Sequence, residues 1–303
     1  MTELNNETLK AFEITPNSFC AGVQRAMMMI NEVITKDELK PFYMLGYLVH
    51  NRNVVSYYED YITVIKEDYD KAIDDIKSGT IIITAHGISP KILDKIKSKN
   101  LNIIDTTCPN VTKVHNYINK YLNLGYNVYV MGSNEHPEVI GYLGISDKVK
   151  IYEKDTILPE KTFLTTQTTL IYNDVLKEFE EIKKKNTSLE IILSKEVCSS
   201  TSKRQEAIIN SFGQYDLYII IGDKLSNNCL SLYNLVINNN YNAIMINSVD
   251  ELNNYDIKKY KKIGVTAGAS TPKAIVKEVI DQINNNVNIY ITNLTKADYI
   301  KFN

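Results

Sequence analysis

One pattern recurs three times along this chain and limits its possible folds more than any other feature. Each copy begins with a cysteine and an amphipathic helix, continues through three short apolar segments, and ends with a charged amphipathic helix. The three cysteines, Cys20, Cys108 and Cys198, lie about 90 residues apart. Strands that alternate with helices are typical of parallel sheets. The sequence therefore predicts an α/β protein of three pseudo-repeated α/β units with small parallel sheets.

A further strand-like segment leads into the second and the third cysteine, as in LNIIDTTC and LEIILSKEVC. The third repeat lacks such a segment at its own end, but AFEITPNSFC near the N-terminus has the same character. We therefore expect the N-terminal segment to cross over and complete the third repeat. The predicted boundaries are 21–107 for the first repeat, 108–197 for the second, 198–285 with 11–20 for the third, and 286–303 for a C-terminal tail without an assigned role.

The repeat makes the three cysteines candidates for one metal site. Ligands gather at the carboxyl ends of parallel strands, so equivalent strand ends that face one axis would bring these cysteines together. Each cysteine also precedes a predicted helix, whose N-terminus favours the thiolate that binds metal. A cubane iron–sulfur cluster that only transfers electrons takes four thiolates. Three thiolates leave one iron with an open position, which can bind a substrate oxygen as a Lewis acid.

The cysteine spacing and the lack of an export signal argue against two other uses of these thiols. The four cysteines include no CxxC pair, which a zinc site normally contains. Without an export signal, a disulfide framework is not expected. Cys229, in SNNCLSLYNL, lies outside the repeat and is interpreted as a helix-packing thiol. For any one cysteine taken alone a core thiol is the simpler interpretation, and only the repeat favours a shared site.

The bulk composition excludes several classes of protein. With 44% hydrophobic and 23% charged residues, the chain has the composition of an ordinary globular protein. Its net charge of -2 argues against a nucleic-acid partner. It contains no apolar run of ~18 residues that could span a membrane, and its polar first residues hold no secretory signal. We expect a soluble protein of a bacterial-type cytoplasm, or of a plastid-type organelle with the transit peptide absent from this chain.

Polar side chains at the predicted strand ends suit an anionic oxygen ligand. Three of the four histidines, His50, His86 and His136, occupy such ends, whereas His115 lies inside a helix and is interpreted as structural. Small donors beside helix N-termini bind anionic oxygens. Few lysines or arginines occur in these loops, so neutral donors and histidines would hold a phosphate group. The equivalent strand ends of the other segments carry Thr168, Ser226, Asn228 and Ser270.

Glu138 follows His136 by two residues, in HPEV. A carboxyl group at a strand end beside a metal can deliver protons as a general acid. It can equally be an ordinary glutamate in the first turn of the next helix. The residues alone leave both interpretations open.

Eight motifs together resemble those of the 4-hydroxy-3-methylbut-2-enyl diphosphate reductase family (LytB/IspH type). Each motif is weak alone, but eight in the same order are specific. Relatives commonly read SSN where this chain has Ser226-Asn227-Asn228, so the middle donor differs here, although an amide can substitute for it. The matching segments are FCAGVQRA, VHNRNVV, TAHGIS, DTTCPNVTKVH, HPEV, TQTTL, CSSTSKRQEA and TAGAS.

The resemblance implies a fold, a cofactor and a reaction. The fold is a trefoil of the three α/β units around a central iron–sulfur cluster. The cluster is [4Fe–4S] with one open iron position, bound by Cys20, Cys108 and Cys198, and oxidation can convert it to [3Fe–4S]. The reaction is the two-electron reductive dehydroxylation of (E)-4-hydroxy-3-methylbut-2-enyl diphosphate to isopentenyl and dimethylallyl diphosphates, the last step of the non-mevalonate isoprenoid pathway.

The resemblance also implies partners and residue roles. Electrons come from a ferredoxin- or flavodoxin-type donor, and no nucleic acid or membrane takes part. Proton delivery falls to Glu138. The implied diphosphate donors are His50, His86, His136, Thr168, Ser226, Asn227, Asn228 and Ser270.

Two other functions stay open from the residues themselves. A non-redox enzyme or binding module for phosphate ligands would use the same strand-end donors and would keep its cysteines in the core. An electron carrier without chemistry of its own would need a fourth cluster ligand, for which Cys229 is the candidate.

Overall fold

The computed structural model describes residues 9–194, 196–285 and 294–302. Its strands form three four-stranded sheets whose strand pairs are parallel, which confirms the predicted fold class. The chain divides into two compact units. Compact unit 1 comprises the described residues up to 20, residues 49–57 and the described residues from 200 onward. Compact unit 2 comprises residues 21–48 and the described residues of 58–199. The predicted repeat boundaries and the trefoil arrangement stay predictions.

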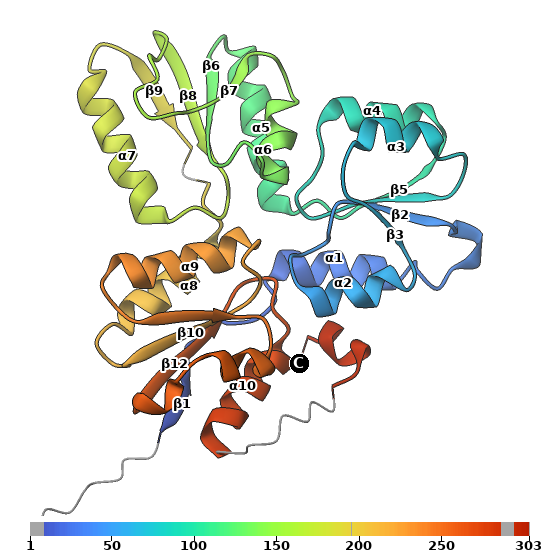
Figure 1. Cartoon of the computed structure of the whole chain (residues 1–303). Helices are drawn as coiled ribbons and strands as arrows, with labels where there is room; N and C mark the ends of the chain where they lie inside the picture. The colour runs from blue at the N-terminus through green and yellow to red at the C-terminus, as the bar shows by residue number, and fades with distance from the viewer. Residues whose placement is uncertain (1–8, 195, 286–293, 303) are drawn as a thin grey trace, which may run out of the picture. The chain divides into compact units, whose positions relative to one another are not determined.

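The sheet of the first repeat lies in compact unit 2. Its strands, in sheet order, are β3 (Thr63–Ile65), β2 (Phe42–Leu45), β4 (Thr80–Ile83) and β5 (Asn102–Asp105). Its helices are α1 (Ala21–Asn31), α3 (Tyr69–Asp75) and α4 (Pro90–Ser98). Figure 1 shows α3 and α4 on one face of the sheet, where Ile73 and Ile96 share a core with Ile81 of β4. β4 is buried along its whole length, as expected for an inner strand of a covered parallel sheet.

The sheet of the second repeat also belongs to compact unit 2. Its strands, in sheet order, are β7 (Val149–Ile151), β6 (Asn127–Met131), β8 (Lys161–Thr166) and β9 (Glu190–Leu193). Its helices are α5 (Pro109–Asn123), α6 (Pro137–Leu143) and α7 (Tyr172–Lys185). α5 and α6 cover one face and α7 the other (Figure 1). Because side chains alternate along a strand, Val128 and Val130 pack with α5 and α6, whereas Tyr129 and Met131 pack toward α7.

The sheet of the third repeat lies in compact unit 1. Its strands, in sheet order, are β1 (Lys10–Glu13), β12 (Lys262–Ala267), β10 (Leu217–Ile221) and β11 (Ala243–Ile246). The helices that follow its strands and cysteine are α8 (Ser199–Asn210), α9 (Asn227–Asn238) and α10 (Lys273–Asn285), and α2 (Arg52–Glu59) lies mostly within this unit. β1 pairs in parallel with β12, so the N-terminal segment forms an edge strand of this sheet.

The outer edge of β1 is closed by a side chain of α10. The Ala11 amide donates to Asn284 Oδ1 at 2.8 Å, and Asn284 Nδ2 donates to the Ala11 carbonyl oxygen at 3.3 Å. An edge strand leaves backbone donors and acceptors without partners, and here one amide side chain satisfies a pair of them. This contact secures the strand that leads toward Cys20.

Part of the predicted C-terminal tail lies outside the described residues, and residues 294–302 contact other segments of compact unit 1. Lys296 Nζ donates to the Ser56 carbonyl oxygen of α2 at 3.1 Å. The Phe302 ring meets Phe19 edge-to-face at 6.3 Å, next to Cys20. The described 3-10 helices are η1 (Asp37–Leu39), η2 (Val249–Asn254), η3 (Ile257–Lys259) and η4 (Lys296–Ile300).

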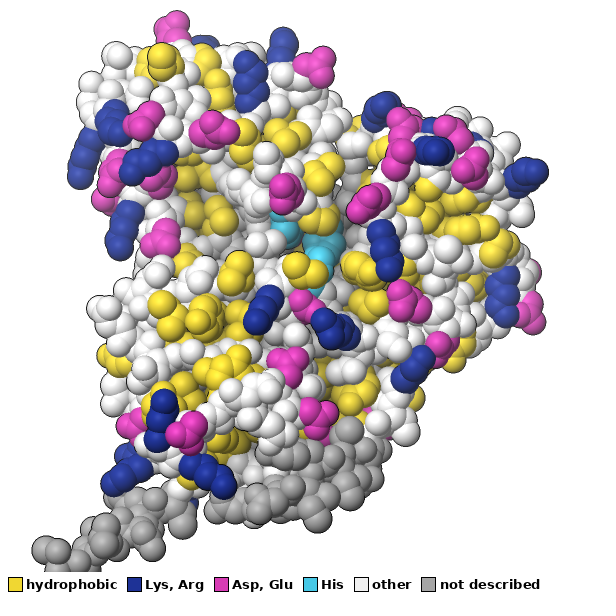
Figure 2. Space-filling model, in the orientation of Figure 1, with side chains coloured by type: hydrophobic (Ala, Val, Ile, Leu, Met, Phe, Trp, Pro, Cys, Tyr) yellow, Lys and Arg dark blue, Asp and Glu magenta, His cyan; other side chains and the backbone are white. Residues whose placement is uncertain are grey.

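The face of the molecule shown in Figure 2 carries charged side chains of both signs. Acidic and basic side chains are interspersed there (Figure 2), and the whole chain carries a net charge of -2. None of the described helices is long and apolar enough to cross a membrane.

Candidate active site

Each of the three predicted ligand cysteines stands directly before a helix, in the same local structure. Cys20 precedes α1, Cys108 is the N-cap residue of α5, and Cys198 precedes α8. All three side chains are half-buried. In each case the cysteine amide bonds to a carbonyl oxygen in the loop after the neighbouring inner strand. These bonds run from Cys20 N to Ala269 O (3.2 Å), from Cys108 N to Ala85 O (3.0 Å) and from Cys198 N to Thr168 O (2.9 Å).

Cys108 and Cys198 are linked within compact unit 2 through Asn110. Asn110 lies in the first turn of α5, two residues after Cys108, and its Nδ2 donates to Cys198 Sγ at 3.2 Å. The sulfur of Cys198 therefore lies beside the N-terminus of the helix that Cys108 begins. Amide donors and helix N-termini both favour negative charge on sulfur. Asn110 carries no signal of this contact in the sequence, because only the fold brings it to a cysteine 88 positions away.

The third thiol belongs to the other compact unit. Cys20 lies in compact unit 1, whereas Cys108 and Cys198 lie in compact unit 2. Over residues 9–194, 196–285 and 294–302, no three His, Cys, Asp or Glu side chains form a group that could hold a metal ion. A cluster shared by the three thiols is thus an inference from the repeat and from the chemistry of the ligands.

Glu138 has a buried carboxyl group held by Thr168. It lies in the first turn of α6 and is 5% exposed. Its Oε2 accepts from the Thr168 amide at 3.0 Å, and its Oε1 accepts from Thr168 Oγ1 at 2.8 Å. Burial raises the pKa of the Glu138 carboxyl above its ordinary value, and the two hydrogen bonds from Thr168 oppose part of that rise. This carboxyl group therefore keeps its proton at higher pH than an exposed one does, as a general acid requires.

Two of the three predicted histidines meet in compact unit 2. The rings of His86 and His136 lie 5.7 Å apart, edge-to-face. His136 is the N-cap residue of α6, and its Nδ1 accepts from the Glu138 amide at 3.3 Å. Since Nδ1 accepts, the neutral ring carries its proton on Nε2, which can donate to an anionic oxygen. Thr84 Oγ1 lies 3.5 Å from His86 Nδ1, within hydrogen-bond distance of the His86 ring.

The third histidine, His50, lies in compact unit 1 near the loop that follows β10. Burial lowers the pKa of His50, and the nearby Asp223 carboxylate opposes part of that change. The next residue, Asn51, caps α2, since its Oδ1 accepts from the Asn53 amide at 3.2 Å and the Val54 amide at 3.3 Å. The cap fixes the backbone next to the imidazole.

The predicted hydroxyl donors of the third repeat are adjacent. Ser226 is the N-cap residue of α9, where its Oγ accepts from the Cys229 amide at 3.5 Å. Ser270 Oγ donates to Ser226 Oγ at 3.4 Å, and both side chains are buried. The structure thus brings together two residues that lie on separate strand-end loops.

Asn228 connects helix α8 with the loop after β12 through its side chain. Its Oδ1 accepts from the Ala269 amide at 2.9 Å, and its Nδ2 donates to Thr201 Oγ1 at 3.1 Å. Ala269 is the residue whose carbonyl oxygen accepts from the Cys20 amide. The predicted donor therefore also supports the backbone next to Cys20. Asn227, the middle residue of the motif, is the first residue of α9 and is half-buried.

Arg204 is a second supporting residue that the sequence analysis did not single out. Its side chain is 2% exposed. Nη1 donates to the Ser200 carbonyl oxygen at 2.9 Å and to Ser200 Oγ, and Nη2 donates to the Ser18 carbonyl oxygen. The guanidinium group thus ties the segment before Cys20 to the first turn of α8. Only its place in CSSTSKRQEA, six residues after the third cysteine, could have drawn attention to it.

Cys229 is a packing thiol, as the sequence analysis expected. It is fully buried, and burial raises the pKa of its thiol. A β-carbon added to Gly222 or to Gly268 would lie 2.1 Å from Cys229 Sγ. The sulfur therefore fills the space that the two glycines leave beside the ends of β10 and β12.

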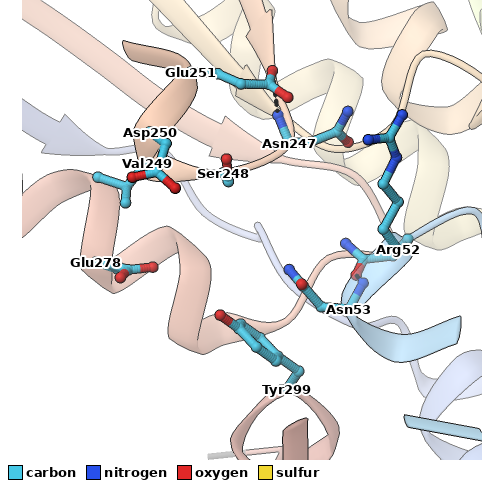
Figure 3. Close-up of a pocket in the computed structure, with 10 residues that line it drawn as sticks. Arg52, Asn53, Asn247, Ser248, Val249, Asp250, Glu251, Glu278 and Tyr299 are labelled. Atoms are coloured by element: carbon cyan, nitrogen blue, oxygen red, sulfur yellow. Dashed lines mark hydrogen bonds between the residues drawn. The ribbon is translucent and has the colours of Figure 1, made fainter. Parts of the chain in front are cut away.

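A separate polar pocket of about 300 Å³ opens at the carboxyl end of β11. Figure 3 shows Arg52 and Asn53 on one side and Asp250 and Glu251 on another, and Tyr299 from the C-terminal segment also lines it. Its wall includes Asn51, the neighbour of His50, but none of the twelve predicted site residues. The pocket was not anticipated, because its wall comes from four separate segments of the chain.

The match to known proteins covers most of the chain. A family model described as LytB protein matches residues 12–284. The chain belongs to the LytB family. This confirms the resemblance carried by the eight motifs, which span the same part of the chain.

The LytB relatives are similar to this chain over most of their length and of its own. A 4-hydroxy-3-methylbut-2-enyl diphosphate reductase of Lysinibacillus sphaericus is 36% identical over 292 residues, which cover 92% of this chain and 90% of that protein. One of Bacillus cytotoxicus is 38% identical over 283 residues, with 90% and 89% covered. The solved structure of the E-1-hydroxy-2-methyl-but-2-enyl-4-diphosphate reductase from Plasmodium falciparum matches with a TM-score of 0.82 at 30% identity, and covers 90% of this chain and 87% of that one.

A second solved LytB-type structure extends the similarity. It is described as (E)-4-hydroxy-3-methyl-but-2-enyl diphosphate reductase, the terminal enzyme of the non-mevalonate pathway. It matches with a TM-score of 0.65 at 28% identity, and the match covers 92% of this chain and 100% of that one.

Proposed function

We propose that this chain reduces (E)-4-hydroxy-3-methylbut-2-enyl diphosphate to isopentenyl and dimethylallyl diphosphates, as the names of its LytB relatives suggest. The observation that carries the proposal is the threefold local structure in which each cysteine precedes a helix and bonds through its amide to a strand-end carbonyl oxygen. A chain that used its cysteines only as core thiols would not need the same backbone setting three times.

The ligands proposed for a [4Fe–4S] cluster are Cys20, Cys108 and Cys198. The donor set fits such a group, because three half-buried thiols at helix starts and the Asn110 amide beside Cys198 all suit an anionic cluster. When bound, the cluster supplies electrons singly and offers one iron with an open position as a Lewis acid. Cys229 is assigned no part in it, since it is fully buried between two glycines.

Glu138 is proposed as the proton donor to the departing hydroxyl group. The reaction consumes two electrons and two protons: the C–O bond breaks, the hydroxyl leaves as water with one proton, and the other proton is added to the carbon skeleton. The raised pKa of Glu138 keeps the carboxyl ready to donate. In this account Thr168 orients the carboxyl group, because its amide and hydroxyl donate to the two carboxyl oxygens.

Eight neutral or weakly basic side chains are proposed to hold the diphosphate. His136 Nε2 is a ready donor because the Glu138 amide occupies Nδ1. The paired hydroxyls of Ser226 and Ser270 suit oxygens of one phosphate group. The full proposed set is His50, His86, His136, Thr168, Ser226, Asn227, Asn228 and Ser270.

The proposed electron source is a ferredoxin- or flavodoxin-type protein, because the reaction needs a low-potential donor that delivers single electrons. A soluble setting, in a bacterial-type cytoplasm or a plastid-type organelle, is part of the proposal.

The test is to purify the chain under anaerobic conditions and to measure iron, sulfide and turnover of the hydroxylated diphosphate with an artificial one-electron donor. We expect a brown protein with about four irons per chain, or about three after exposure to air, that releases both isomeric products. A colourless, iron-free protein that binds inorganic pyrophosphate would point instead to a non-redox phosphate-ligand protein.

A further inference from the structure

The imidazole of His115 fills a gap between two glycines of compact unit 2. His115 lies in the middle of α5. A β-carbon added to Gly87 would lie 3.7 Å from His115 Nε2, and one added to Gly141 would lie 3.6 Å from the same atom. Gly87 follows His86 in the loop after β4, whereas Gly141 belongs to α6, which His136 caps. One ring therefore contacts the two segments that carry the paired histidines.

Close backbone packing joins the same two segments without the ring. A β-carbon added to Gly144, the C-cap residue of α6, would lie 2.5 Å from Ser89 Cβ. One added to Gly141 would lie 3.6 Å from the carbonyl carbon of Ile88. The glycines, three residues apart, leave a flat strip on α6 against residues 87–89. We name Gly87, Gly141, Gly144 and His115 the glycine seam.

The His115 ring is held in the glycine seam by van der Waals packing and not by a hydrogen bond from Nε2. Its Nε2 is buried and has no hydrogen-bond partner in the part of the chain that the structure describes. Its ring packs edge-to-face on Tyr142, with centroids 5.1 Å apart and a 71° angle between planes. Replacing an unsatisfied buried nitrogen with a C–H group costs little or stabilises the fold, whereas removing the ring leaves a cavity.

We infer that His115 is a positioning residue that sets the spacing of His86 and His136 by spanning the glycine seam. The seam connects the first two repeats at the carboxyl ends of β4 and β6, and the two histidine rings meet 5.7 Å apart at the same ends. The functional consequence rests on the proposed role of these histidines in holding a diphosphate. A displacement of ~1 Å in such a pair can cost as much as 10²-fold in binding or rate.

The test compares His115→Ala with His115→Phe, which keeps an aromatic ring but not the nitrogen. Asn116→Ala, at an exposed position one residue further along α5, is the matched control. Dissociation constants for inorganic pyrophosphate are measured on the anaerobic holoenzymes, with the unfolding midpoint as a separate readout. We expect His115→Ala to weaken pyrophosphate binding about ten-fold with iron content unchanged, and His115→Phe to retain most of the affinity.

Crystal structures of the same variants test the inference without any ligand. The separation of the His86 and His136 rings should increase in His115→Ala and stay near 5.7 Å in His115→Phe. Unchanged ring separation in His115→Ala would overturn the inference, even if the variant unfolds at lower temperature. If His115→Phe were as damaging as His115→Ala, the nitrogen and not the ring would matter, and the inference would be wrong. Failure of the wild-type enzyme to bind pyrophosphate would overturn the proposed function, while the ring separation would still decide the role of His115.

Discussion

At the residue scale, the protonation of Glu138 affects both the stability of the fold and the proposed proton transfer. Its carboxyl group is buried in the first turn of α6, and burial raises its pKa although Thr168 donates two hydrogen bonds to it. Because the folded-state pKa lies above the unfolded-state pKa, the folded protein binds more protons than the unfolded chain at pH values between the two. Stability from this group is therefore fully present below the unfolded-state pKa and is lost as pH rises through the folded-state pKa.

The first prediction follows from this loss of stability with rising pH. Glu138→Gln cannot ionise, and its amide oxygen can still accept from Thr168, so its free energy of unfolding should exceed that of the wild type increasingly as pH rises above about 4.5. Denaturant unfolding of both proteins over a series of pH values measures the difference. Glu135→Gln, at an exposed position nearby, is the control and should show no such trend. A difference that stays constant with pH would contradict the raised pKa.

The same substitution makes a second prediction about catalysis. A glutamine cannot donate a proton to a departing hydroxyl, so turnover of the hydroxylated diphosphate should fall by about 10²–10⁴-fold. Iron content and pyrophosphate affinity should stay at wild-type levels, because Glu138 is not a proposed ligand of either group. Unchanged turnover in Glu138→Gln would refute the proton role.

At the scale of elements, the sequence was enough to predict the repeat and its completion. Parallel inner strands appear in the sequence as apolar runs. The strand-like character of AFEITPNSFC predicted that the N-terminal segment joins the third repeat, and in the structure β1 pairs with β12. The sequence could not predict the residues that support the cysteine loops, such as Asn110, Arg204 and Asn284. Their hydrogen-bond partners lie at distant positions in the chain. The local sequence around a polar residue in a helix does not indicate which distant group it will contact.

Asn284 supplies the third prediction, at the edge of the third sheet. Its side chain bonds to both the amide and the carbonyl oxygen of Ala11 in β1. Asn284→Ala should lower the free energy of unfolding by ~1–2 kcal/mol, because two backbone groups of an edge strand lose their partner. Asn285→Ala, at the exposed neighbouring position, is the control. Equal stability of the two variants in urea unfolding would contradict the account of the β1 edge.

On the scale of the whole molecule, the match to known proteins shows the family of the chain, and the local geometry shows which predicted site residues lie near each other. The LytB match over residues 12–284 establishes the family. The predicted residues meet in two sets, with His86, His136, Glu138 and Thr168 in compact unit 2 and His50, Ser226, Asn228 and Ser270 in compact unit 1. The sequence pointed to these residues from their places at or near strand ends, but it predicted one shared site and not two sets. It interpreted His115 only as structural, because the two glycines that its ring contacts are distant in sequence.

The central claim is that Cys20, Cys108 and Cys198 hold one cluster and that Cys229 does not. The measurement that tests it most directly is the iron and sulfide content of Cys20→Ser, Cys108→Ser and Cys198→Ser, purified without air beside Cys229→Ser as the matched control. We predict that each of the first three proteins loses most of its iron and its turnover, while the control keeps wild-type iron. Full iron content in any of the three, or loss of the cluster in Cys229→Ser alone, would contradict the account.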